Sequence, residues 1–143
     1  MRIAIINGPN LNLLGTREPE LYGSQSFELY FAELHKKFPA VEFSYFQSNV
    51  EGELVNELQR VGFDYDGIVH NPAGYTHTSV AIGDAIAAIK APVIEVHISN
   101  IKAREEFRHI SHVSAKCKGT IAGLGLAGYE LAVKFFVGTY VQG

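Results

Sequence analysis

Hydrophobic residues recur along the chain in two alternating patterns. Short apolar runs such as Ile3–Ile6 predict buried strands, because a strand covered on both faces has no polar side. Longer segments with apolar residues at i, i+3, i+4 and i+7 predict helices that bury one stripe. The predicted strands are Arg2–Asn7, Val41–Gln47, Gly67–Asn71, Pro92–Ile98 and Thr120–Gly123. The predicted helices are Phe27–Phe38, about Ser48 to Val61, about Ser79 to Lys90, about Ala103 to Phe107, and about Ala127 to Val137.

Polar residues and breakers mark the ends of the first two helices. Ser26 is a plausible N-cap for the first, and Pro39 ends it. Ser48 has a glutamate three residues on, at Glu51, which is the pattern of a capping box at the start of the second. Gly62 is a natural stop after that helix.

Strands and helices alternate throughout, which predicts an α/β fold with a parallel sheet and helices on both faces. We expect one domain over residues 1–143, with a flavodoxin-like, doubly wound sheet of five strands in the order 2-1-3-4-5. Ligands bind such sheets outside the carboxyl ends of the strands at the switch point, here between strands one and three. Polar side chains follow strands one, three and four at that edge: Asn10, Arg17, Tyr22, Asn71, His77, His97, Ser99 and Asn100.

The loop after the first strand, from Gly8 to Gly23, is far longer than the usual strand-to-helix connection of about 2–6 residues. It carries an amide at Asn10, a cation at Arg17 and a phenol at Tyr22. That composition is typical of a catalytic lid. The alternative is a surface loop with ordinary polar residues.

Glu95, His97 and Ser99 occupy alternate positions of the fourth strand, so their side chains share one face. A carboxylate beside a histidine fixes its tautomer and favours its protonated form, which would make His97 a general acid. The alternative is a satisfied polar pair in the core.

Two further features combine charge with helical spacing. Arg104 and Arg108 share a face of the predicted short helix, and Arg108 follows strand four closely enough to reach the site. The alternative is surface pairing with Glu105 or Glu106. Asp84 is the only charge in its otherwise apolar helix, so it lies either at an interface with another subunit or on the helix's solvated side.

Composition excludes several classes of protein. The formal net charge of −3 does not favour nucleic acid binding, and no run of about 18 apolar residues predicts a membrane span. A single cysteine, Cys117, cannot form an intramolecular disulfide, which fits a reducing cytoplasm. The pair His109 and His112 lacks a third ligand, so we expect no metal site.

Residues 123–128 match the G-x-G-x-x-G pattern of dinucleotide-binding folds, after a strand and before a helix. The chain offers no strand after that helix and no acidic residue about 20 positions on to bind a ribose. A tight strand-to-helix turn is the favoured interpretation, with a nucleotide-binding module as an alternative.

Three long motifs carry a resemblance that covers essentially the whole chain. Residues 7–23, residues 71–81 with Asn71-Pro72 and Tyr75-Thr76-His77, and residues 95–108 with Glu95-Val96-His97-Ile98-Ser99-Asn100 are similar to the signatures of the type II 3-dehydroquinate dehydratases. The glycine-rich turn and Gly128-Tyr129 match that family too.

The resemblance implies reversible anti elimination of water from 3-dehydroquinate through an enolate, giving 3-dehydroshikimate in the shikimate pathway, with no cofactor, Schiff base or metal. Tyr22 matches the base, Arg17 its activator and His97 the acid, with Asn10 holding a water against the enolate oxygen. Substrate-binding positions match Asn71, His77, Ile98, Ser99 and Arg108, and Asp84 matches a residue lent by a neighbouring subunit of a homododecamer built from four trimers. The alternative function is a non-catalytic, flavodoxin-like protein that binds a small molecule.

Overall fold

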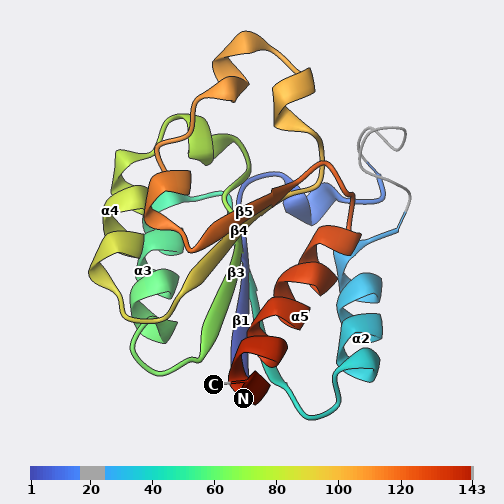
Figure 1. Cartoon of the computed structure of the whole chain (residues 1–143). Helices are drawn as coiled ribbons and strands as arrows, with labels where there is room; N and C mark the ends of the chain where they lie inside the picture. The colour runs from blue at the N-terminus through green and yellow to red at the C-terminus, as the bar shows by residue number, and fades with distance from the viewer. Residues whose placement is uncertain (17–24, 143) are drawn as a thin grey trace.

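The computed structural model describes residues 1–16 and 25–142 and contains one parallel sheet of five strands (Figure 1). The strand order is β2-β1-β3-β4-β5, as the sequence predicts. Every neighbouring pair is parallel. The strands are β1 (Arg2–Asn7), β2 (Glu42–Gln47), β3 (Gly67–Asn71), β4 (Val93–His97) and β5 (Gly119–Ala122).

Among the described residues, four helices cover the two faces of the sheet. Helices α2 (Phe27–Lys37) and α5 (Ala127–Gln142) lie on one face, and α3 (Glu51–Val61) and α4 (Val80–Ala88) lie on the other (Figure 1). Helix α5 continues past the predicted end at Val137. Short 3-10 helices occupy the connections: η1 (Leu11–Leu13), η2 (Ala73–His77), η3 (Ile101–Ala103), η4 (Glu106–His109) and η5 (Ser114–Lys116). No helix of the described residues is long and apolar enough to cross a membrane.

The apolar run in β1 follows from its position between two layers of helices. Ile3 and Ile5 pack into the core beneath α2 and α5, whereas Ala4 and Ile6 pack into the core beneath α3 and α4. All four side chains are fully buried, and each buried isoleucine contributes about 1.5–3 kcal/mol through removal of apolar surface from water. Strand β2 lies at the edge of the sheet and is less buried.

The predicted capping box at Ser48 is wrong. The N-cap of α3 is Val50, and the Ser48 hydroxyl accepts a 2.9 Å hydrogen bond from the Val50 N–H and bonds Glu53 instead of Glu51. Ser48 still donates its own N–H to the carbonyl of Asn7 in β1, at 3.1 Å. That bond keeps Ser48 in the register of the sheet, so the helix begins two residues later.

The predicted helix from Ala103 to Phe107 is also wrong. Two 3-10 helices, η3 and η4, replace it, and Arg104 between them is extended, with φ −105° and ψ −161°. The Lys102 ammonium donates to the carbonyl of His109 at 2.7 Å, which closes this segment into a loop. Arg104 and Arg108 therefore do not share a helix face.

Gly8 brings the loop after β1 against the loop after β3. Its N–H donates to the carbonyl of Asn71 at 2.7 Å, and a Cβ at this position would lie only 2.7 Å from the carbonyl oxygen of Pro72. Both contacts are with backbone, which cannot move aside as a side chain can. The absence of a side chain at Gly8 thus lets the two site-bearing loops meet.

We expect Gly8→Ala to lower the free energy of unfolding by about 1–3 kcal/mol, the usual effect of overpacking. Gly52→Ala is the matched control, since nothing lies within 4 Å of its added Cβ and it sits in α3. This control should raise stability by up to about 1 kcal/mol through helix propensity. Urea titration measures both, and equal stability of Gly8→Ala and the parent protein would contradict the argument.

Candidate active site

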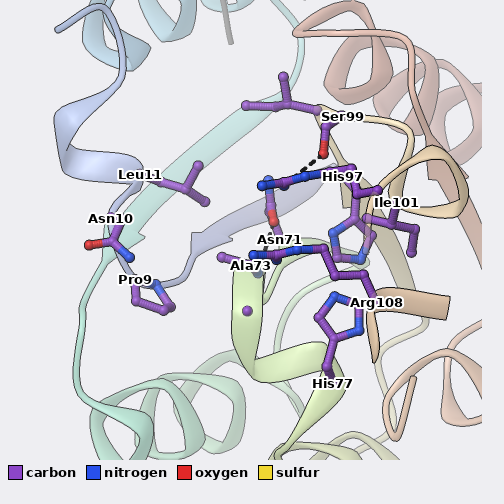
Figure 2. A pocket seen from close by; sticks show the side chains of 13 residues that line it. Pro9, Asn10, Leu11, Asn71, Ala73, His77, His97, Ser99, Ile101 and Arg108 are labelled. Carbon is purple, nitrogen blue, oxygen red and sulfur yellow. Dashed lines mark hydrogen bonds between the residues drawn. The ribbon is translucent and has the colours of Figure 1, made fainter. Parts of the chain in front are cut away.

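A cavity of about 130 Å³ opens at the carboxyl edge of β1, β3 and β4, where the strand order places the switch point. Residues at or after the carboxyl ends of these three strands line it: Pro9, Asn10, Leu11, Asn71, Ala73, Gly74, His77, His97, Ile98, Ser99, Ile101, Arg104 and Arg108. Figure 2 shows Asn10 on one side of the cavity, with His77 and Arg108 on the other. The structure therefore brings together Asn10, Asn71, His77, His97, Ile98, Ser99 and Arg108, which the sequence analysis had selected.

Glu95 lies fully buried behind His97. Its Oε2 is 2.5 Å from His97 Nε2 and accepts a 2.5 Å bond from the Thr76 hydroxyl, and its Oε1 accepts from the hydroxyls of Ser114 and Thr120. Burial alone would raise the pKa of Glu95, but the hydrogen bond and charge of His97, with the hydroxyls of Ser114 and Thr76, lower it to about 2. Glu95 is therefore a carboxylate at neutral pH.

The Glu95 carboxylate determines which nitrogen of His97 can exchange a proton with a ligand in the cavity. A carboxylate only accepts hydrogen bonds, so Nε2 of His97 carries a hydrogen in both the neutral and the charged ring. Nδ1 is then the position that gains or loses a proton, and His97 is among the residues that line the cavity. The pair has the arrangement that a general acid requires.

His77 and Arg108 form the opposite wall. His77 Nδ1 donates to the carbonyl of Ile110 at 2.7 Å, so the neutral ring leaves Nε2 as an acceptor. Partial burial lowers the pKa of His77 despite that bond, which favours the neutral form. Arg108 bonds Glu105 at 3.2 Å and stacks on the Phe107 ring, 5.0 Å from its centroid.

Arg104 is a cavity residue that the sequence analysis assigned only to a helix face. Its Nη1 donates to the Ser99 hydroxyl at 3.3 Å, and it lines the cavity alongside Arg108. The extended backbone at Arg104 turns its side chain back toward the end of β4. Arg108 was predicted at the site because it follows strand four closely in the sequence. Arg104 follows the same strand even more closely, so the same argument predicts it at the site.

Besides Glu95, which lies behind His97 and does not itself line the cavity, three predicted site residues lie outside this cavity or outside the described residues. Asp84 is exposed on α4 and does not line the cavity. Arg17 and Tyr22 lie outside the described residues. Within residues 1–16 and 25–142, no group of three or more histidine, cysteine or acidic side chains could hold a metal ion.

Comparison with known proteins decides the family. The model of the dehydroquinase class II family matches residues 1–137. The chain belongs to the class II dehydroquinase family. A 3-dehydroquinate dehydratase from an Exiguobacterium species is 55% identical over 134 residues, covering 93% of this chain and 92% of that protein. One from Fusobacterium nucleatum is 51% identical and covers 98% of this chain and 99% of its own length.

Solved structures of class II dehydroquinases share the fold. The type II dehydroquinase from Butyrivibrio crossotus superposes with a TM-score of 0.91 at 45% identity, covering 95% of this chain and 97% of that one. A 3-dehydroquinate dehydratase-like protein from Bifidobacterium longum is more distant, with a TM-score of 0.67 at 29% identity and coverages of 95% and 94%.

Two buried titratable groups, His70 and Glu95, lie next to each other in the sheet. His70 in β3 pairs in register with Glu95 in β4 and is fully buried, with Nδ1 2.9 Å from the carbonyl of Ile6. Burial lowers the pKa of His70 to about 4, below its ordinary value of 6.5, although the bond to Ile6 opposes the shift. The folded protein therefore keeps His70 neutral at pH 7.

We expect the free energy of unfolding to fall with pH in two successive windows. Between about pH 6.5 and pH 4, His70 is protonated in the unfolded chain but stays neutral in the folded protein. The free energy of unfolding therefore falls as the pH falls from about 6.5 to about 4. Unfolded Glu95 binds a proton more readily than the folded carboxylate, so stability is lost as the pH falls from about 4.5 to about 2.

Denaturant unfolding at a series of pH values tests both windows. His70→Asn should flatten the upper window, and Glu95→Gln should flatten the lower one. An unchanged pH profile in either variant would show that the residue does not titrate with folding.

Proposed function

We propose that this chain catalyses the reversible dehydration of 3-dehydroquinate to 3-dehydroshikimate, a step of the shikimate pathway. The observation that carries the proposal is the Glu95–His97 pair at the wall of the switch-point cavity, in a chain that matches the dehydroquinase class II model over residues 1–137. The reaction is an elimination, so it needs a base at one carbon and an acid at the departing hydroxyl. No metal or cofactor enters the proposed chemistry.

The proposed base is Tyr22, and its proposed activator is Arg17, a little earlier in the sequence. An unperturbed tyrosine has a pKa near 10, so only about 0.1% is ionised at pH 7. An adjacent guanidinium favours the phenolate and lowers such a pKa by about 1–3 units. The phenolate then takes the proton from C2, and the electron pair that remains forms an enolate.

The proposed acid is His97. Its Nδ1 gives a proton to the hydroxyl at C1, the C1–O bond breaks, and water leaves as the double bond between C1 and C2 forms. Glu95 accepts from Nε2 of His97 and orients the ring throughout. Removal of the proton and the hydroxyl from opposite faces gives the anti stereochemistry.

Asn10 is proposed to hold a water against the developing enolate oxygen, where charge needs stabilisation. Its backbone supports a fixed position, because Asn10 adopts a left-handed conformation at φ 71°. Its N–H donates to the side chain of Asn49 at 2.9 Å, and Gln47 bonds the carbonyl of Gly8 nearby at 3.1 Å. These bonds anchor the start of the long loop to the end of β2.

The remaining wall residues are proposed to bind substrate. Ile98 and Ser99 would hold the carboxylate, and the guanidinium of Arg104 against Ser99 adds positive charge there. Arg108, His77 and Asn71 would then contact the hydroxyl groups of the ring. In a protein of net charge −3, this local cluster of cations is what attracts an anionic substrate.

The proposal extends to assembly and location. The outer face of α4 is exposed and mostly apolar, with Val80 58% exposed near Asp84. Such a face supports docking of a second subunit that receives Asp84 in its site, within a homododecamer of four trimers. Each subunit would be a single catalytic domain. The one cysteine, Cys117, is free, which supports a place in the reducing cytoplasm.

Ultraviolet absorbance tests the reaction directly, because the product is a conjugated enone carboxylate and the substrate is not. We expect absorbance to rise when 3-dehydroquinate is added in the presence of EDTA. His97→Ala should slow turnover by about 10²–10⁴-fold, the usual contribution of a general acid, and Tyr22→Phe should abolish it. The exposed His35 on α2 provides the matched control, and His35→Ala should keep the parent rate.

A folded protein that binds 3-dehydroquinate without any rise in absorbance would refute the enzyme and favour a non-catalytic binding protein. Near-normal turnover by Tyr22→Phe would refute only the role of Tyr22 as base.

Asp84→Ala tests the shared site. We expect this variant to lose activity, because one subunit would lack a contact that its neighbour supplies, whereas Asp64→Ala at another exposed position should keep activity. Sedimentation velocity on the same samples gives the assembly size. A monomer with full activity would contradict the shared site.

A further inference from the structure

Tyr129 is a buried polar residue that none of the roles above uses. It lies in the first turn of α5, directly after the glycine-rich turn, and its side chain is fully buried. Its ring packs edge-on against Phe27 at 4.9 Å between centroids, within the core beneath α2 and α5. Its hydroxyl reaches the carboxyl ends of β1 and β3, where it bonds Asn7 at 2.8 Å and Asn71 at 2.9 Å.

The direction of each of these hydrogen bonds follows from one fixed donor. The backbone N–H of Ala73 can only donate, and it lies 3.0 Å from Oδ1 of Asn71. Nδ2 of Asn71 therefore faces Tyr129 and donates to its oxygen. The hydroxyl hydrogen is then directed to Oδ1 of Asn7. Burial raises the pKa of Tyr129 well above its ordinary value, so the hydroxyl keeps this hydrogen.

This chain of bonds leaves the Asn71 side chain a single choice of orientation. One of its two Nδ2 hydrogens is used by Tyr129, and its oxygen is used by Ala73. The second Nδ2 hydrogen remains for the cavity, which Asn71 and Ala73 both line. Asn71 is thereby held with an Nδ2 hydrogen left to donate to a ligand, while its Oδ1 already accepts from Ala73.

The same bonds support an uncommon backbone conformation. Ala73 has a positive φ of 53°, which is unfavourable for a residue with a side chain. The bond from its N–H to Asn71 offsets part of that cost and holds the turn that places Ala73 and Gly74 at the cavity wall (Figure 2 shows Asn71 and Ala73).

We propose that Tyr129 is a positioning residue for substrate binding, which fixes Asn71 as a hydrogen-bond donor toward a substrate hydroxyl or carbonyl oxygen. This inference rests on the proposed function for the identity of the substrate. Tyr129 itself does not line the cavity and acts only through Asn71. The glycine-rich turn that leads into α5 therefore has a use in this chain that is unrelated to dinucleotides.

Steady-state kinetics with 3-dehydroquinate separates this role from a general effect on the core. Tyr129→Phe removes only the hydroxyl, and we expect KM to rise about tenfold, equivalent to 1.4 kcal/mol, while kcat changes by less than about threefold. Tyr30→Phe is the matched control, because the Tyr30 hydroxyl is buried in the same aromatic cluster and has no hydrogen bond of normal geometry among the described residues. This control should leave KM unchanged.

A double-mutant cycle tests whether the effect passes through Asn71. Tyr129→Phe combined with Asn71→Ala should raise KM no further than Asn71→Ala alone, because the hydroxyl then has no side chain to orient. Additive effects, an equal change in Tyr30→Phe, or a loss of kcat at constant KM would each overturn the proposal.

A crystal structure of the Tyr129→Phe protein gives a readout that does not depend on turnover. We expect Asn71 to leave its position and its bond to Ala73 to be lost. Retention of that bond in the variant would overturn the inference even if the parent protein proves inactive, whereas an inactive parent protein with a displaced Asn71 would refute only the proposed reaction. Should Tyr129→Phe fail to fold, Asn7→Leu, which removes the acceptor of the hydroxyl hydrogen, is expected to give the same displacement.

Discussion

A buried carboxylate imposes the main constraint on this site. Removing a charge from water costs several kcal/mol unless partners replace the lost hydration, and Glu95 is fully buried. The partners come from separate parts of the chain: His97 from the same strand, Thr76 from η2, Ser114 from η5 and Thr120 from β5. Solvating one charge therefore fixes η2, η5 and β5 relative to β4.

A second polar network lies on the other face of the sheet and has a different character. Asn7, Asn71 and Tyr129 are neutral, and their order follows from donor and acceptor counting alone. The glycine-rich turn links this network to the charged one. The N–H of Gly123 donates to the carbonyl of His97 at 3.2 Å, and that of Gly125 donates to Ile98 at 3.0 Å. Both glycines have positive φ, which this close turn requires.

The sequence predicted the sheet well because burial on both faces leaves a strong signal. The first and last residues of β1 and β3 are those predicted. The strand order is also the predicted one, because alternation of strands and helices allows few topologies. Placement of Asn71, His77 and His97 at one edge followed from that order. The pattern of hydrophobic and polar residues could not show that Ser48 stays bonded to β1. That bond joins two backbone groups, the N–H of Ser48 and the carbonyl of Asn7, and so does not depend on the side chains.

Errors were concentrated in the connection after β4, where spacing alone suggested a helix. Its conformation depends on tertiary bonds, such as the one from Lys102 to the carbonyl of His109, and these leave no periodic pattern. Arg104 was misplaced for this reason. The roles of Arg17, Tyr22 and Asp84 rest on resemblance, because a residue in a long loop or on an outer helix face has no neighbours that periodicity can reveal.

The interior position of β1, between β2 and β3, has a consequence for how the chain folds. Strand β1 is the first element in sequence, yet it pairs with β3, whose residues begin at Gly67. Parallel pairing of this kind requires closure of a long loop before any contact is gained, which slows folding. During synthesis the apolar strand Ile3–Ile6 is made before β2 and β3, and its pairing with β3 waits until that strand has been made. The same residues that give the native sheet its core are thus the ones most exposed to misassociation while the chain is incomplete.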